Sequence, residues 1–148
     1  MKSTAAINAY AKTGLESSVA SADPHKLISM LFEGALQAIY NAKNGIMRND
    51  TIGKSASISK AIAIIGEGLH ASLDKSVGGE LAQNLSSLYD YMVFRLVAAN
   101  LKNDIEILDE VARHLADLKD AWDSIRNITP AAIQVQVKNN AQLAYGRV

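Results

Sequence analysis

Three histidines, His25, His70 and His114, carry the most distinctive chemistry available to this chain. An imidazole can hold a metal ion or move a proton near neutral pH. Glu67 and His70 form one Glu-x-x-His pair, the spacing with which helical bundles hold paired metal ions. That chemistry needs a second pair, but Glu110 and His114 are four residues apart rather than three. We therefore expect no metal site.

Phosphotransfer is the second chemistry that a histidine could support in a helical bundle. The reactive histidine of such modules usually lies in His-x-x-Lys-Gly, whereas His70 and His114 open the stretches HASLDK and HLADLK. Neither a glycine-rich phosphate loop nor a Gly-x-Ser-x-Gly elbow is present. We expect no enzyme and no cofactor, and keep phosphotransfer as an alternative that acid-labile phosphate on a histidine would reveal.

Acidic residues also gather at the start of the last helical pattern. Carboxylates stabilise the N-terminal end of a helix dipole, which explains this group without catalysis. Its members are Asp104, Glu106, Asp109 and Glu110.

Composition narrows the class of protein further. The 148 residues are 49% hydrophobic and 20% charged, which is typical of one globular domain. Lys plus Arg and Asp plus Glu are balanced at 15 each, which argues against a nucleic-acid partner. There is no cysteine, no visible secretory signal, and no apolar run near the ~18 residues that a membrane span needs. We expect a soluble, cytoplasmic protein with no membrane insertion.

Four helical patterns can position these groups. Asp23 and Pro24 are a favourable N-cap and first residue for a helix that ends near Arg48. Further helices are predicted at about 51–73, 80–101 and 103–127, the last with a capping box from Asn103 to Glu106 and a heptad core. The short loops predict an all-α, antiparallel four-helix bundle over residues 21–127. Its core in the fourth helix is expected to be Leu108, Val111, Leu115, Leu118, Trp122 and Ile125.

Two segments flank this bundle. Residues 1–20 are weakly amphipathic and are interpreted as an N-terminal arm. Residues 128–148 are polar and rich in Asn and Gln, and are interpreted as a mobile or partner-dependent C-terminal tail. The stretch AIQVQVK within the tail alternates like a strand but has no visible partner strand.

The third helix contains YDYMVFRLVAANL, residues 89–101, which has no polar side. The expected core positions of this helix are Leu81, Leu85, Leu88, Met92 and Ala99, which leaves several apolar residues on other faces. The extra face could be covered by neighbours in an irregular bundle, by the N-terminal arm, by a second copy in a homodimer, or by an amphipathic helix from a partner. The second helix favours a partner groove, because small residues such as Gly66 let a guest segment approach closely.

Three stretches carry a resemblance to a known family. ADPHKLISMLFEGAL, GGELAQNLSSLYDYM and LVAANLKNDIEILDEV, in this order and at similar spacing, resemble the FliS family of flagellar secretion chaperones. The likeness runs from about Tyr10 to Trp122. Phe32-Glu33 stands where the family commonly has Tyr-Asp, Phe94-Arg95 stands where it commonly has two basic residues, and the tail is longer than usual.

The resemblance implies a four-helix bundle that binds the C-terminal segment of flagellin in the cytosol. It implies that the chaperone prevents premature polymerisation and keeps flagellin competent for the flagellar type III export apparatus. It also implies an N-terminal arm that can lie over the client groove, for which Ile7 and Tyr10 are the candidate residues. The candidate groove residues are Phe32, Leu36, Tyr91, Phe94, Val97, Ala98 and Leu101.

Overall fold

A computed structural model describes residues 23–73 and 78–125, and all regular structure in these two ranges is helical. Helix α3 spans Pro24–Met47, α4 spans Thr51–Ala63, α6 spans Gly79–Lys102 and α7 spans Ile105–Asp123. After α4 the chain continues through a π-helical segment, Ile64–Leu69, and a 3-10 turn, His70–Ser72. The four-helix prediction is therefore confirmed. The predicted arm, with Ile7 and Tyr10, and the predicted tail lie outside the described residues.

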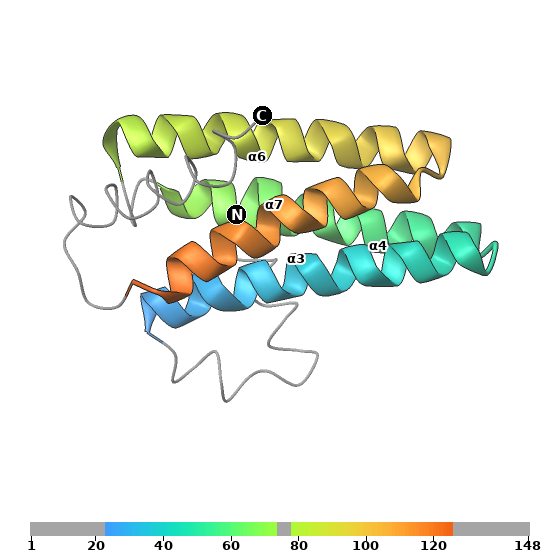
Figure 1. Ribbon diagram of the computed structural model, residues 1–148, viewed down its shortest axis with the longest axis horizontal. Coiled ribbons are helices and arrows are strands. Elements are labelled where there is room, and N and C mark those ends of the chain that lie inside the picture. Colours follow the sequence, from blue (N-terminus) through green and yellow to red (C-terminus); the bar gives the residue numbers. More distant parts are fainter. Residues whose placement is uncertain (1–22, 74–77, 126–148) are drawn as a thin grey trace.

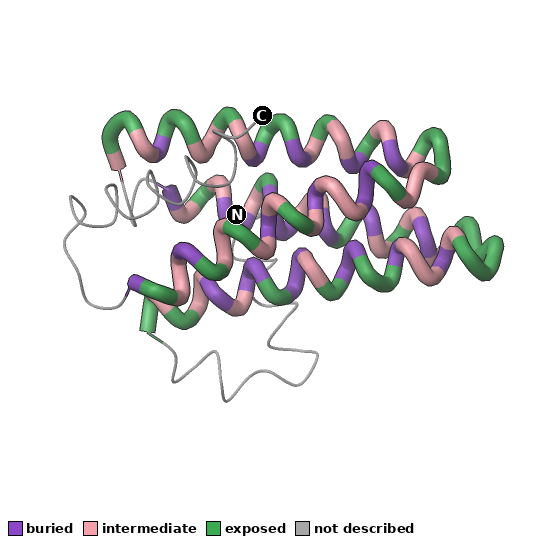
Figure 2. Tube along the Cα trace, in the orientation of Figure 1, coloured by how far each residue is buried: buried purple, intermediate pink, exposed green. Residues whose placement is uncertain are grey.

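Consecutive helices run in opposite directions, so the described chain forms an antiparallel bundle (Figure 1). Helix α3 packs against α4 and α7, and α6 packs against the same two helices from the other side. The π-helical segment extends the α4 column and contacts both α3 and α6. Figure 2 shows buried positions recurring along every helix where it meets its neighbours. Within the described ranges, no helix combines the length and the apolarity needed to cross a membrane.

Aspartates begin three of the helices. The Asp23 carboxylate accepts a hydrogen bond from Lys26 N at 2.7 Å, and the Asp50 carboxylate accepts one from Gly53 N at 3.0 Å. Asp104 accepts from two backbone amides of α7, at 3.0 and 3.3 Å. These contacts satisfy amides that lack partners within the first helical turn.

Asn103 does not cap α7, contrary to the prediction from the Asn103–Glu106 spacing. Its backbone lies in the left-handed region, with φ 52° and ψ 43°, and it ends α6. Asparagine tolerates this conformation better than most residues because its short polar side chain can bond locally. Asn103 is therefore the C-cap of α6, and the next residue, Asp104, is the N-cap of α7.

The core of α7 follows the predicted heptad. Leu108, Val111 and Leu115 are fully buried, Ile125 is 1% exposed, and Leu118 and Trp122 pack against the core from its edge. The core of α6 differs from the prediction. Met92 and Ala99 are buried as expected, but the expected Leu81, Leu85 and Leu88 are only partly buried. The remaining buried residues of α6 are Ala82, Tyr89 and Leu96.

Two glycines allow close contact between the first two helices. A methyl group on Gly68 would lie 3.2 Å from Leu31 Cδ2, so α3 fills the space beside this residue. A methyl group on Gly45 would lie 2.9 Å from the backbone nitrogen of Lys54. The approach of a guest segment to the small residues of the second helix stays a prediction. Within the bundle, Gly68 neighbours Leu31 of α3, and a methyl group on Gly66 would lie 3.9 Å from Val93 Cγ2 of α6.

Lys54 is a buried charge at the end of the bundle where α6 terminates. Its side chain is 5% exposed, and Nζ donates to Asn100 O at 2.9 Å and to Asn103 Oδ1 at 2.7 Å. A cation beside the last carbonyls of a helix is favoured by the helix dipole. Lys54 therefore ties α4 to the end of α6 and fixes the position of its last turn.

Candidate binding surface

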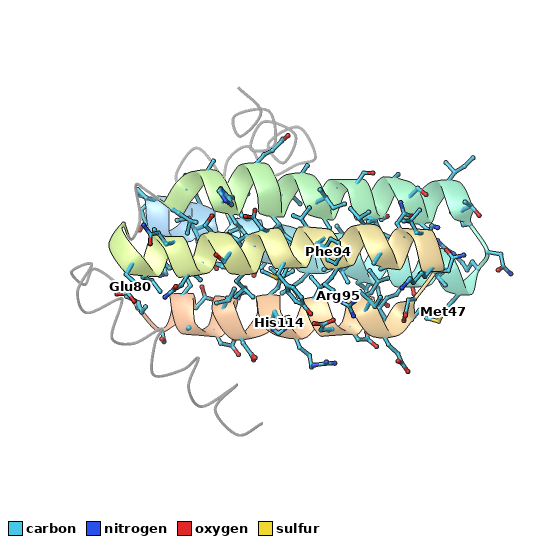
Figure 3. All side chains as sticks on the ribbon, turned by 90° about the horizontal axis from the view of Figure 1, so that it is seen from above. Met47, Glu80, Phe94, Arg95 and His114 are labelled. Atoms are coloured by element: carbon cyan, nitrogen blue, oxygen red, sulfur yellow. The ribbon has the colours of Figure 1, made fainter. Side chains whose placement is uncertain are left out.

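The solvent-facing side of α6 changes character near its middle. Its exposed positions up to residue 90 are small or polar, namely Gly79, Glu80, Gln83, Asn84, Ser87 and Asp90. From residue 91 the exposed positions are apolar until Lys102: Tyr91 at 42%, Phe94 at 68%, Val97 at 46% and Leu101 at 80%. These four residues are called the α6 stripe. Figure 3 looks onto α6 and shows Phe94 on this outer side.

Helical periodicity explains why one short stretch supplies both a core and an exposed apolar surface. Met92, Leu96 and Ala99 have no exposed side-chain area and point into the bundle. The α6 stripe recurs at intervals of three, three and four residues, so it occupies the opposite side of the same helix. The second apolar face expected from the sequence exists, and its four residues are between 42% and 80% exposed.

Phe32 does not belong to this surface. It is 3% exposed and buried in the core, because α3 packs against both α4 and α7. Leu36 and Ala98 are partly buried and pack against the core. Of the seven candidate groove residues, the structure thus presents the α6 stripe to solvent, leaves Leu36 and Ala98 half-covered, and excludes Phe32.

Sequence reasoning missed two exposed apolar residues at the turn between α3 and α4. Met47 is 61% exposed and Ile52 is 85% exposed. The ends of α3 and α6 lie at the same end of the bundle, so both residues share that end with Leu101 (Figures 1 and 3). The available signal was an apolar residue in the last turn of a helix, Met47, with the turn residues Asn49 and Asp50 two positions later.

A carboxylate on α7 fixes the edge of the stripe that faces it. Glu110 accepts hydrogen bonds from Tyr91 Oη at 2.5 Å and from Arg95 Nε at 2.9 Å, and His114 Nε2 lies 3.5 Å away. Burial alone would raise the pKa of Glu110, but the bonds from Tyr91 and Arg95 outweigh it and lower the pKa. The bond to Glu110 raises the pKa of the Tyr91 hydroxyl. The phenol ring is therefore held in place between α6 and α7.

His70 lies beside a serine and an aspartate, but not in the order of a catalytic triad. Its Nε2 atom is 2.7 Å from Ser86 Oγ and 3.7 Å from Asp90 Oδ1. A triad needs the carboxylate on the other ring nitrogen, so that it orients the ring toward the serine. Across residues 23–73 and 78–125, no group of three or more His, Cys, Asp or Glu residues could hold a metal ion.

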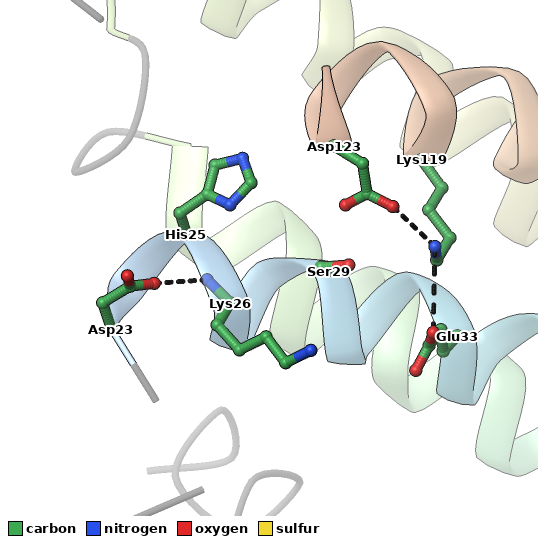
Figure 4. A pocket seen from close by; sticks show the side chains of 7 residues that line it. All are labelled: Asp23, His25, Lys26, Ser29, Glu33, Lys119 and Asp123. Carbon is green, nitrogen blue, oxygen red and sulfur yellow. Dashed lines mark hydrogen bonds and ion pairs between the residues drawn. The ribbon is translucent and has the colours of Figure 1, made fainter. Parts of the chain in front are cut away.

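The far end of the bundle carries a charged pocket of about 480 Å³ between α3 and α7 (Figure 4). Lys119 Nζ lies 2.6 Å from Asp123 and 3.7 Å from Glu33. Burial would raise the pKa of Asp123, but the bond from Lys119 outweighs it and the pKa falls. Beside the pocket, His25 stacks on Trp122 with ring centroids 4.9 Å apart. The charged side chains of the pocket largely pair with one another, and the pair of Lys119 with Glu33 holds α3 and α7 together.

Comparison with known proteins assigns the family. The model of the family described as flagellar protein FliS matches residues 6–129. The chain belongs to the FliS family. It is 47% identical over 125 residues to the flagellar secretion chaperone FliS of Salmonella typhimurium, covering 84% of this chain and 93% of that protein. It is 45% identical to the FliS of Escherichia coli, covering 85% and 92%, and 44% identical to FliSB of Pseudomonas aeruginosa, covering 81% and 94%.

The family match separates two parts of this FliS-family chain. It includes every described helix and therefore the whole α6 stripe with Glu110. It stops at residue 129, so the last 19 residues of the 148 lie beyond the FliS family model. The resemblance seen in the sequence is confirmed over the bundle and says nothing about that extension.

Proposed function

We propose that this chain is a cytosolic chaperone that binds the C-terminal segment of flagellin and keeps it unpolymerised and competent for the flagellar export apparatus. Membership of the FliS family supports a role in flagellar protein secretion, because its relatives are named flagellar secretion chaperones. The observation that carries the client-binding part is the α6 stripe, an apolar surface that folding alone leaves exposed.

The stripe suits a helical client. Its residues repeat along one side of α6, so an amphipathic helix laid against them could bury its own apolar face. A client segment that wraps further around the bundle would bury on the order of 2,000 Å² or more. Ordering that segment offsets part of the gain, which keeps a specific complex releasable.

A calorimetric titration with the C-terminal segment of the host's flagellin tests this proposal. We expect a saturable complex of one client per chain with a large negative heat-capacity change, because apolar surface is buried. A folded chain that shows no heat of binding across a range of temperatures would contradict the client assignment.

The N-terminal arm is proposed to cover the stripe while no client is bound. Its apolar residues Ile7 and Tyr10 are the candidates for that contact. Deleting residues 1–18 should then raise the binding of a hydrophobic dye to an otherwise intact bundle. Unchanged dye binding with unchanged helicity would rule the arm out as a cover.

Self-association through the same stripe is the second candidate function. An exposed apolar helix face can pair with its own copy in a homodimer. Sedimentation across a wide concentration range separates the two ideas. A dimer that resists dilution and that flagellin does not dissociate would favour a structural role over a chaperone role.

A further inference from the structure

The balanced charge of the chain hides an uneven distribution. Residues 23–73 carry five Lys and Arg and four Asp and Glu, whereas residues 78–125 carry four Lys and Arg and nine Asp and Glu. Residues 126–148 contain Arg126, Lys138 and Arg147 and no acidic residue. The α6–α7 half of the bundle is therefore acidic, and the segment that follows it is basic.

Part of this acidity forms a row beside the α6 stripe. Glu106, Glu110 and Asp117 are spaced by four and seven residues, so all three lie on the same side of α7. These three residues lie opposite the buried Leu108 and Leu115, on the outer face of α7, and Glu110 reaches Tyr91 from the edge of that face beside α6. Glu106 and Asp117 are exposed, and neither side chain bonds to another group within the described ranges. Arg113 lies among them as the one exposed base of α7.

At the seam between the two helices Arg95 is already paired with Glu110. The carboxylates left beside the apolar stripe for a basic segment are those of Glu106 and Asp117. The seam fits a segment that is both apolar and basic. Residues 126–148 have that composition, since their three cations alternate with apolar residues at Ile128, Ile133, Val135, Val137, Leu143, Tyr145 and Val148.

The length and starting point of that segment also fit. It leaves from Ile125, directly after α7, and contains 23 residues. The level of Glu106 lies 17 residues before Asp123, the last residue of α7, or about 26 Å at the helical rise. A 23-residue segment covers about 35 Å if helical and more if extended, so it reaches the whole seam.

We propose that the C-terminal segment 126–148 docks along the α6–α7 seam, with its cations against Glu106 and Asp117 and its apolar side chains against the Tyr91 edge of the stripe. The opposite edge, at Val97, remains available to the N-terminal arm. A regulatory role for this docking rests on the proposed function, because the docked segment would compete with flagellin for the Tyr91 edge.

A spin label tests the docking without any client. Because the chain has no cysteine, Gln142→Cys in the full chain gives a single attachment point for a nitroxide. In NMR spectra we expect selective broadening of the amide signals of Phe94 and Asp117, with Gln37 of α3 and Ser59 of α4 unaffected. Broadening should disappear near 1 M salt, where the screening length falls to about 3 Å.

Charge substitutions supply the matched comparison. Glu106→Gln with Asp117→Asn should abolish the selective broadening, whereas Glu33→Gln with Glu67→Gln removes the same charge elsewhere and should preserve it. Uniform or absent broadening in the parent, or loss of broadening in both variants alike, would overturn the docking proposal.

The client titration is then repeated with Arg126, Lys138 and Arg147 each changed to Gln. Tighter flagellin binding than in the parent would support competition, and unchanged affinity would overturn it while leaving docking intact. Selective broadening together with no flagellin binding by any variant would instead contradict the proposed function alone.

Discussion

Helices α6 and α7 are neighbours that bury similar apolar stripes, yet the faces that they present to water differ in composition. Every exposed position of α7 is charged, namely Glu106, Arg113, Asp117 and Asp120. The exposed positions of α6 between residues 91 and 101 are all apolar. Folding requires only the buried stripe of each helix, so the outer face of α6 is the one whose composition needs another explanation.

Making the outer face of α6 resemble that of α7 should have the largest effect. Phe94→Asp with Leu101→Asp removes two large apolar anchors, each worth about 1.5–3 kcal/mol when buried. We expect flagellin affinity in a calorimetric titration to fall by at least about 100-fold. Thermal stability should change little, because both side chains are exposed in the free chain.

The polar half of α6 offers the control for that variant. Gln83→Asp with Ser87→Asp adds the same two charges to the outer face of the same helix. Client affinity should be preserved there. Equal losses in both variants would mean that added charge, and not the apolar stripe, decides binding.

Substitutions in the buried stripes should lower stability to a similar extent in the two helices, unlike a substitution on the outer face of α6. Leu96→Ala in α6 and Leu108→Ala in α7 each empty a fully buried site and should lower the free energy of unfolding by about 2–5 kcal/mol. Phe94→Ala should change it by no more than about 0.5 kcal/mol. Urea denaturation measures all three, and a large loss for Phe94→Ala would show that the stripe is part of the core.

The junction between the helices predicts an intermediate effect. Asn103→Ala puts alanine, whose side chain cannot form a local hydrogen bond, in the left-handed region, and it removes the acceptor for Lys54. The free energy of unfolding should therefore fall by about 1–2 kcal/mol. Asn103→Gly relieves the backbone but still loses the acceptor, so its cost should be smaller. Equal unfolding free energies for the two variants would show that backbone conformation contributes nothing here.

The link through Glu110 predicts a smaller effect than Asn103. Glu110→Gln should lower stability at neutral pH by less than about 1 kcal/mol, since the site is partly solvated. The pKa of Glu110 is lowered in the folded chain, so its stabilisation is present above the ordinary carboxyl pKa and is lost as pH falls through the lowered value. The melting temperatures of the parent chain and of Glu110→Gln should therefore differ at pH 7 and converge in acid. A difference that persists in acid would assign the effect to packing.

Clean amphipathic patterns were sufficient to predict much of this fold. The α7 heptad could be assigned because its apolar residues fall on one side only. In α6 the apolar residues surround the helix, so periodicity offers two stripes and does not rank them. It predicts Leu88 in the core, whereas the structure buries Leu96 fully and Leu88 only partly. Choosing between the stripes depends on the neighbouring helices, which is tertiary information.

The candidate surface shows the same limit. Phe94 and Leu101 fall outside the predicted core stripe, and both are exposed. Phe32 is a candidate groove residue in the sequence, and only the packing of α4 and α7 around α3 reveals that it is internal. At Asn103 and Asp104, two adjacent residues could each begin a helix, and backbone geometry decided between them.

The contact between Trp122 and His25 has a spectroscopic consequence. Trp122 is the only tryptophan, and its indole nitrogen donates to His25 O at 2.9 Å while the two rings stack. It lies near the end of α7, away from the end of the bundle that holds Leu101 (Figure 1). Intrinsic fluorescence should therefore report separation of α3 from α7 and remain nearly silent when a ligand occupies the α6 stripe. One emission signal can then monitor folding during a binding titration without being confused with binding.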